Sequence, residues 1–225
     1  MARRGFASSK ATTPKEWADI ESFFVGKMGV PESVRQAEEA SKKAGLPNAS
    51  VPASLGMLLR QLAHGHARVL EVGTLGGVSA LWLCDDGRRQ VTTVDISAAN
   101  AALAQQAFDR ARVSRHIQVL VGDARTLVPA LPAQSFDFMF VDADKASNDV
   151  YVRAGVEGLV RPGGRIVVDN VVRAGSVVEG GNEAERGVRR LLDYLQSCAP
   201  RLSWTVIQTV GPKGHDGFCV IQLKD

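Results

Sequence analysis

Oxygen-bearing side chains and a lysine follow two apolar segments in the second half of the chain. The two stretches are Phe140–Lys145 (FVDADK) and Val168–Asn170 (VDN). Asp142, Asp169 and Asn170 offer two carboxylates and one amide oxygen, which suit a hard divalent cation, Mg²⁺ before Zn²⁺, because no Cys or His is placed to help. Three protein ligands would leave about three of six octahedral positions open for water and a chelating ligand.

Lys145 lies three residues after Asp142 and is close enough to reach the same space. A nearby cation disfavours the protonated form of a lysine, so Lys145 is a candidate general base. Structural explanations stay open: a helix N-cap for Asp142 or Asp144, a turn for Asp169–Asn170, and simple solvation for the lysine. The combination at two successive segment ends favours the metal site.

A glycine-rich stretch, Glu71–Ser79 (EVGTLGGVS), ends another apolar segment. Glycines let the backbone approach a ligand closely and expose amides at the start of the next helix. A dinucleotide fingerprint needs G-x-G-x-x-G, but Leu75 stands at the second glycine position, which favours a smaller nucleoside ligand. The candidate ligand-binding residues of this stretch are Glu71, Gly73, Thr74, Gly77 and Ser79.

Two further acids extend this nucleoside site. Asp95 ends the next apolar segment, 22 residues after Gly73, where a carboxylate suits ribose hydroxyls. Asp123 and Ala124 follow the segment after that, and Asp123 could accept a hydrogen bond from an adenine amino group. A helix cap for Asp95 and a turn for Asp123 remain alternatives. Glu71 is harder to explain structurally, because a carboxylate inside a buried strand is costly unless it is partnered.

The histidines and cysteines add less. The histidines lack helical metal-ligand spacing, so surface positions are expected for His64, His66 and His116, while His215 could line the ligand cleft. Three cysteines without CxxC spacing predict reduced, buried thiols and a reducing compartment such as the cytoplasm. They are Cys84, Cys198 and Cys219.

The elements that must position these residues alternate between strands and helices from residue 66 to the end. Val- and Ile-rich segments suit a parallel sheet buried on both faces, with ligands beyond the carboxyl ends of its strands. They are Arg68–Val72, Gln90–Asp95, Ile117–Val121, Phe136–Asp142 and Gly164–Asp169, with helices such as Ala98–Arg112 between them. Trp204–Val210 and Phe218–Leu223 predict an antiparallel hairpin joined by Gly211–Gly217. The expected fold class is α/β, a doubly wound, mostly parallel seven-stranded sheet of Rossmann-like type.

Three helices are expected before the sheet, over residues 14–65. Thr13–Glu16 reads as a capping box with Pro at the first helical position. Pro31 begins a second helix that Gly45 ends, and Pro52 begins a third. No domain boundary is visible, so residues 1–225 are expected to form one domain, with residues 1–15 flexible.

The composition is that of a globular protein, with 45% apolar and 23% charged residues. No apolar run approaches the roughly 20 residues that span a bilayer. Residues 1–15 carry four basic and no acidic side chains, so the remaining chain has a net charge of −1 out of a total of +3. Such a balanced body argues against a nucleic-acid partner. The acid-free start resembles an organellar transit peptide, with a solvated terminus as the alternative.

These residues resemble a known family. Glu71–Ser79, Asp142–Lys145, Pro162–Gly164 and Asp169–Asn170 look like the cation-dependent O-methyltransferases. These are the catechol and caffeoyl-CoA type within the class I S-adenosylmethionine-dependent enzymes. The resemblance covers roughly residues 50–223, and its DADK and DN segments are more specific than the glycine turn.

The resemblance implies an activity. S-adenosylmethionine would occupy the nucleoside site, and Mg²⁺, Mn²⁺ or Ca²⁺ would bind Asp142, Asp169 and Asn170. Adjacent hydroxyls of a small phenolic acceptor would bind the metal, Lys145 would take the proton, and the oxygen would attack the sulfonium methyl group. A homodimer is implied, with N-terminal helices that help to cover the acceptor. The implied cofactor-binding residues are Glu71, Gly73, Thr74, Gly77, Ser79, Asp95, Asp123, Ala124 and Asp142.

Some positions near the cleft depart from the family pattern. Asn148 stands where members often carry Tyr, although Tyr151 occupies the next such position. Val78 replaces an aromatic residue of the glycine turn, and Arg173 replaces an expected Trp. These departures bear on the acceptor rather than on the chemistry, and Arg173 is a candidate for recognising an anionic acceptor.

Other functions compete for the same residues. A nicotinamide oxidoreductase shares the sheet and the ribose acid but is opposed by Leu75 and leaves Asp169–Asn170 unexplained. A nucleic-acid methyltransferase is opposed by the neutral body of the chain. A non-catalytic S-adenosylmethionine-binding protein would hold the cofactor without turnover, and the intact Asp142 and Lys145 argue against it.

Overall fold

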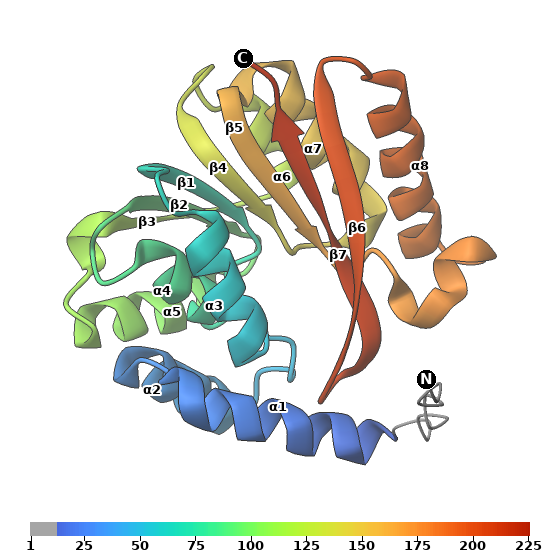
Figure 1. The fold of residues 1–225 in the computed structure, drawn as a ribbon. Helices are drawn as coiled ribbons and strands as arrows, with labels where there is room; N and C mark the ends of the chain where they lie inside the picture. The colour runs from blue at the N-terminus through green and yellow to red at the C-terminus, as the bar shows by residue number, and fades with distance from the viewer. Residues whose placement is uncertain (1–12) are drawn as a thin grey trace, which may run out of the picture.

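A seven-stranded sheet forms the centre of the structure, a computed structural model that describes residues 13–225 (Figure 1). The strand order is β3-β2-β1-β4-β5-β7-β6. Strands β1 to β5 run parallel, whereas β7 is antiparallel to both of its neighbours. The strands are β1 (Arg68–Val72), β2 (Gln90–Asp95), β3 (Ile117–Val121), β4 (Phe136–Val141), β5 (Val160–Asp169), β6 (Leu202–Gly211) and β7 (Gly214–Leu223). The predicted fold class is confirmed.

The last three strands are longer than the sequence predicted. β5 begins at Val160 rather than Gly164, because the Pro162–Gly164 stretch continues the strand past a register shift opposite β4. β6 and β7 pair as far as Gly211↔Gly214, which replaces the expected 211–217 connection with a tight turn. Cross-strand pairing supplies hydrogen bonds that local β-propensity does not reveal. β4 is one residue shorter than expected and ends at Val141.

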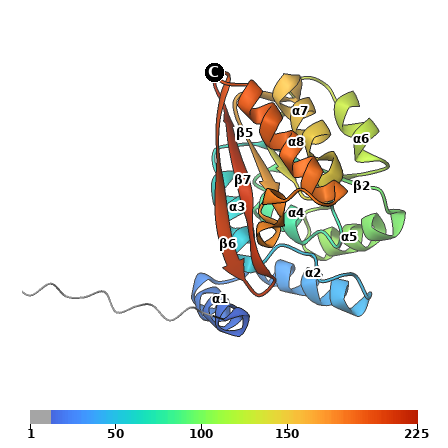
Figure 2. The same ribbon diagram turned by 90° about the vertical axis from the view of Figure 1, so that its right-hand side faces the viewer.

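Helices cover both faces of the sheet (Figures 1 and 2). They are α1 (Pro14–Met28), α2 (Glu32–Lys43), α3 (Ala53–Leu62), α4 (Val78–Cys84), α5 (Ala98–Arg110), α6 (Ala124–Leu127), α7 (Asn148–Ala154) and α8 (Glu183–Ser197). Shorter helical turns are η1 (Ser114–His116), η2 (Val128–Ala130), η3 (Lys145–Ser147), η4 (Gly155–Leu159) and η5 (Arg173–Val178). The capping box of Thr13 and Glu16 is present, so residues 13–15 belong to the start of α1. The predicted transit segment otherwise lies outside the described residues.

The alternation of side chains along each strand divides the core into two layers. On β4, Phe138 and Phe140 pack with residues of α3, α4 and α5. Met139 and Val141 point the other way and pack with residues of α7 and α8. Period-two burial on both faces explains why the central strands read as continuous apolar runs.

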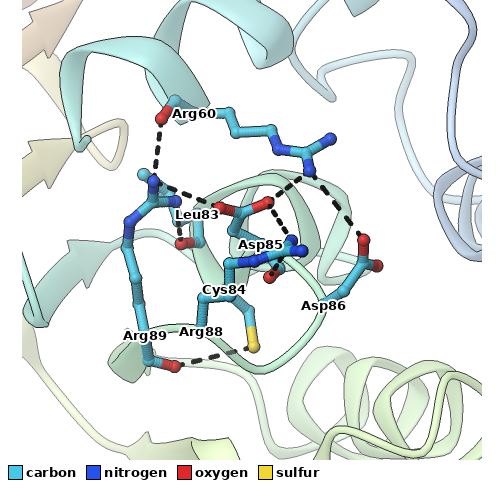
Figure 3. Close-up of polar contacts among 7 residues, drawn as sticks. All are labelled: Arg60, Leu83, Cys84, Asp85, Asp86, Arg88 and Arg89. Atoms are coloured by element: carbon cyan, nitrogen blue, oxygen red, sulfur yellow. Dashed lines mark hydrogen bonds and ion pairs between the residues drawn. The ribbon is translucent and has the colours of Figure 1, made fainter. Parts of the chain in front are cut away.

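A charged network ties α3 to the end of α4, at the edge of the sheet where the parallel strands begin (Figure 3). The Arg89 side chain is only 5% exposed and donates to the carbonyls of Leu83 and Arg60, each at 3.0 Å. Asp85 balances its charge at 3.4 Å and also contacts Arg60. These residues lie at the end of the sheet opposite to the candidate functional residues.

Two further observations concern the cysteines and the apolar character of the helices. Cys84, Cys198 and Cys219 are free and buried, as predicted. Between residues 13 and 225, none of the helices has the length and apolar character required to span a bilayer.

Candidate functional site

Two adjoining cavities open beyond the carboxyl ends of the parallel strands. The larger cavity, of about 720 Å³, lies beside the glycine turn and the ends of β2, β3 and β4. The smaller cavity, of about 350 Å³, is lined by residues of α1, α3 and the β6–β7 hairpin. Ala49, Asn170 and Lys213 line both, so they mark the junction between them. The predicted residues that line the larger cavity are Gly73, Thr74, Ser79, Asp95, Asp123, Ala124, Asp142, Lys145 and Asn170.

The glycine turn approaches β4 closely. Gly73 has a φ of +107°, and a side chain there would come within 2.8 Å of the Asp142 carbonyl carbon. Leu75 adopts a φ of +47°, the left-handed conformation that a glycine favours, while its side chain lines the larger cavity. Gly77 lines neither cavity; it begins α4, and a side chain there would come within 2.6 Å of the Phe108 ring. The close approach of Gly73 to Asp142 therefore places the predicted nucleoside site next to the predicted metal site.

Asp95 fixes this turn to the end of β2. Its Oδ2 accepts from the amides of Thr74 and Leu75, at 3.2 and 2.8 Å. Its Oδ1 accepts from the Ser97 amide at 2.8 Å and from the Asn100 side chain at 3.2 Å. The N-cap of α5 is Ser97, not Asp95. Four donors already use this carboxylate, so a ribose hydroxyl would share its lone pairs with the loop.

Glu71 lies behind the turn and lines neither cavity. It is fully buried, and its Oε2 accepts from the Thr93 hydroxyl at 2.6 Å. The Thr93 and Thr74 hydroxyls are themselves 2.6 Å apart, which links Glu71 to the turn. Burial raises the pKa of Glu71 to about 8, although hydrogen bonds from Ser79 and Thr93 lower it. A protonated acid at neutral pH explains how this side chain remains buried without a cation.

Asp123 combines a structural contact with a place on the cavity wall. Its carboxylate caps α6 by accepting from the Arg125 amide at 2.9 Å. It also lies 2.5 Å from the Arg125 guanidinium, and both side chains line the larger cavity with Ala124. Asp123 is therefore a helix cap, where the sequence had left a turn as the structural alternative, and it still lines the cavity.

Asp142, Asp169 and Asn170 meet where β4 and β5 end. The parallel register continues to Val141↔Val168, so the residues that follow lie side by side. Lys145 Nζ is 2.6 Å from Asp142 Oδ1. Burial, and then the negative charge of Asp142, raise the pKa of Asp169. Negative charge collects at this point, which favours a cation.

The donor set of this cluster is mixed. Within residues 13–225, no group of three or more His, Cys, Asp or Glu is arranged to hold a metal ion. The predicted set instead joins two carboxylates to one amide oxygen, a combination suited to Mg²⁺ or Ca²⁺. The metal assignment therefore stays a prediction.

Comparison with known proteins decides the family. Residues 30–212 match a family model described as O-methyltransferase. The chain belongs to the O-methyltransferase family. The predicted resemblance and the prediction of an S-adenosylmethionine-dependent O-methyltransferase are thereby confirmed.

Relatives of this O-methyltransferase match almost its whole length. It is 37% identical over 211 residues to a catechol O-methyltransferase of Mycobacterium tuberculosis, covering 92% of this chain and 96% of the relative. The O-methyltransferase TomG of Streptomyces achromogenes, solved with S-adenosylmethionine, has a TM-score of 0.89 and 31% identity, with 96% and 100% covered. A Bacillus cereus O-methyltransferase solved with S-adenosylhomocysteine has a TM-score of 0.87 and 31% identity, with 94% and 100% covered.

The sequence did not reveal one residue that supports the O-methyltransferase site. Asp216 accepts from the Asn170 side-chain amide at 3.2 Å, and from the amides of Val172 and Arg173 at 3.1 and 2.8 Å. The bond to Asn170 Nδ2 leaves its Oδ1 free to act as a ligand. An Asp-Gly pair in an expected hairpin is usually a turn signal, so nothing local pointed to this role.

Two candidates for lining the cleft lie elsewhere in the O-methyltransferase. Arg173 lines neither cavity, because the backbone turns at the start of η5, and its charge acts on Glu185 of α8. The structure thus gives no support to an acceptor-binding Arg173. His215 also lines neither cavity; β7 extends through it, and its Nε2 lies 2.9 Å from Gln208 Oε1 on β6.

The other departures from the family pattern flank the larger cavity. Val78 and Tyr151 line it, and the Tyr151 hydroxyl donates to Asp144 at 2.5 Å. Asn148 and Tyr151 are both buried, and only Tyr151 lines the larger cavity.

Proposed function

We propose that this O-methyltransferase uses a divalent cation to transfer the methyl group of S-adenosylmethionine to a small acceptor with adjacent hydroxyls. The observation that carries the proposal is the meeting of Asp142, Asp169 and Asn170 at the junction of two cavities. The larger cavity has room for the methyl donor, and the smaller cavity for a single-ring acceptor. The relatives named for catechol methylation and those solved with the cofactor or its product support this assignment.

The chemistry of the donor set fits a hard cation. Asp169 and Asp142 supply two neighbouring carboxylates, and the Asp216 hydrogen bond orients the Asn170 amide so that its oxygen is available. Asp142, Asp169 and Asn170 would therefore hold Mg²⁺, Mn²⁺ or Ca²⁺. When bound, the cation would supply Lewis-acid chemistry that makes an acceptor hydroxyl easier to deprotonate.

The chain itself would position the reactants and move one proton. The glycine turn, Asp95 and Asp123 would hold the donor in the larger cavity, with Glu71 acting through Thr93 and Thr74. Lys145 lies at the cavity wall beside Asp142. In its neutral form, which a cation held by Asp142 would favour, its Nζ would accept the acceptor's hydroxyl proton. Holding both reactants in contact and excluding water accounts for much of such catalysis.

The acceptor would lie in the smaller cavity. Leu55, Leu58, Ile207, Val210 and Phe218 give it an apolar lining, which suits an aromatic ring. Asp169 and Asn170 stand at one end of this lining, where the hydroxyls would be. α1 and the tip of the β6–β7 hairpin lie close together and would cover the ring (Figure 1).

We also propose that the enzyme is a homodimer and acts in a reducing compartment such as the cytoplasm. Large apolar side chains are exposed on α1 and on the edge strand β6, where a second copy would cover them. Those that do not line the acceptor cavity are Ile20, Phe23, Phe24, Met28 and Trp204. Three free, buried cysteines fit the compartment. Light scattering that gives a monomer mass at micromolar concentration would contradict the dimer.

One assay tests the function. The protein is incubated with S-adenosylmethionine and a simple catechol, with Mg²⁺, with EDTA, and with EDTA followed by excess Mg²⁺, and the methylated product is measured by mass spectrometry. We expect product in the first and third samples alone. Asp169→Asn should abolish it, whereas Asp193→Asn, at an exposed position of α8, should not.

Two results would change the proposal. Transfer that continues in EDTA would exclude the cation-dependent mechanism. Tight cofactor binding without transfer to any of several catechols would favour a non-catalytic S-adenosylmethionine-binding protein.

A further inference from the structure

Lys213 stands at the junction of the two cavities. It lies in the tight turn between β6 and β7, which the shorter predicted strands had placed in a long connection. It lines the smaller cavity together with Asp169, and it lines the larger cavity together with Asp142 and Lys145. No other Lys or Arg lines the smaller cavity in the described part of the chain.

The charge of Lys213 is not neutralised at close range. Its Nζ donates to the backbone carbonyl of Ser50, and within residues 13–225 it forms no ion pair. Asp142 is already paired with Lys145. The carboxylate of Asp216 is occupied by hydrogen bonds to the 170–173 segment. Lys213 is exposed, and Asp142, Asp169 and Glu38 attract its charge from a longer distance. An ammonium without a contact ion pair is able to bind an incoming anion.

Glu21 of α1, which lines the smaller cavity with Asp169 and Asp216, has a structural partner. Its Oε1 accepts from the Ser54 amide at 3.1 Å. α3 has Pro52 at its N-cap, with no side-chain cap of its own, so Glu21 supplies the missing acceptor at that helix N-terminus. The helix amides offset the charge of Glu21, whereas Lys213 has no such contact with an opposite charge.

We propose that Lys213 selects acceptors that carry an anionic substituent, a carboxylate on the ring, which its ammonium binds where the two cavities meet. The inference rests on the proposed function and adds the charge of its acceptor. It assigns to Lys213 the role that the sequence suggested for Arg173. The exposed position of Lys213 in the turn lets the carboxylate remain partly hydrated while the ring occupies the apolar lining.

The experiment compares two matched ligands, 3,4-dihydroxybenzoate and its methyl ester. Binding of each is measured by calorimetry with S-adenosylhomocysteine and Mg²⁺ present, and kcat/KM is measured with S-adenosylmethionine. Lys213→Gln removes the charge but keeps a donor for the Ser50 carbonyl. It therefore separates recognition of the carboxylate from the contact that holds the 48–51 loop. Lys43→Met, at an exposed end of α2 that lines neither cavity, is the control.

We expect the wild type to favour the carboxylate at least tenfold. Lys213→Gln should lose about tenfold or more in affinity and kcat/KM for the carboxylate, with the ester changed by less than about threefold, as one charged hydrogen bond predicts. Lys213→Arg should retain the preference, and Lys43→Met should match the wild type.

Several results would overturn the inference. Equal losses for both ligands in Lys213→Gln would make Lys213 a contact that only closes the 48–51 loop. A change confined to the affinity for S-adenosylmethionine would assign the ammonium to the donor's carboxylate instead. Calorimetry tests the role of Lys213 even if neither ligand is methylated. The absence of methylation would count against the proposed function, whereas selective binding of the carboxylate would still support the inference about Lys213.

Discussion

Asn170 donates its side-chain amide to Asp216 at 3.2 Å, although the two residues are 46 positions apart. The antiparallel pairing of β7 with β5 brings them together, ending at Asp169↔Phe218. Asp216 thereby orients a predicted cation ligand and holds the backbone that follows it. A residue outside the proposed ligand set thus controls how well that set is formed.

The first prediction concerns this contact. Asp216→Ala should lower the apparent Mg²⁺ affinity about 10- to 100-fold, because supporting contacts of metal ligands typically contribute that much. Titration of activity with Mg²⁺ measures it, with the melting temperature recorded to exclude unfolding. His215→Ala, which alters a side chain bonded to Gln208, is the neighbouring control. Unchanged Mg²⁺ dependence in Asp216→Ala would contradict the role.

The second prediction concerns how α8 supports Lys145. A side chain at Gly187 would collide with the Lys145 carbonyl and come within 2.7 Å of the Ala146 backbone. Arg190, one turn later, donates to the Ala146 carbonyl at 2.6 Å. Gly187→Ala should therefore displace the η3 turn and lower kcat roughly 10- to 100-fold, since misplacement by about 1 Å has such effects.

Gly26→Ala is the matched control for this helix substitution. Gly26 lies in α1, and a side chain there would meet nothing within 4 Å. It should raise the free energy of unfolding by about 0.5–1 kcal/mol and leave kcat unchanged. If Gly187→Ala behaves in the same way, α8 does not position Lys145.

The third prediction concerns pH and Glu71. Its pKa is raised from 4.5 to about 8 in the folded protein, chiefly by burial. Between these values the folded state holds a proton that the unfolded chain has released, so this contribution to stability is complete below pH 4.5 and is lost as pH rises toward 8. Glu71→Gln should remove a slope of up to about 1.4 kcal/mol per pH unit in that interval.

Urea denaturation of the cofactor-free protein at pH 5, 6.5 and 8 measures this effect. The variant should gain stability relative to the wild type as pH rises. Glu39→Gln, at an exposed position of α2, should follow the wild-type curve. A constant difference between Glu71→Gln and the wild type would show that Glu71 is ionised in the folded state.

The fourth prediction concerns the network of Figure 3. Asp85→Asn would leave the buried Arg89 charge without its ion-pair partner at 3.4 Å and should lower the free energy of unfolding by about 3 kcal/mol. Arg88→Ala removes an exposed partner of the same Asp85 and should cost less than about 1 kcal/mol. Chemical denaturation measures both, and kcat at low temperature should be unchanged. Similar losses of unfolding free energy for both variants would show that the burial of Arg89 does not set the size of the effect.

The sequence by itself determined the sheet and most of the cavity wall. Parallel strands buried on both faces read as apolar runs, and each ends in polar residues that the α/β fold gathers at one edge. Asp95, Asp123, Asp142 and Asp169 could therefore be named, because each ends a recognisable strand or follows it within two residues. The capping box at Thr13 was equally local, since its two partners are three residues apart.

Only the tertiary structure decided which residues from the end of the chain join them. Asp216 and Lys213 approach the cluster because β7 returns antiparallel beside β5 and extends to Gly214, past a predicted loop. The same packing placed Arg173 and His215 outside both cavities and Glu71 behind the glycine turn. These positions depend on contacts between distant strands, whose hydrogen bonds leave no periodic pattern in the local sequence.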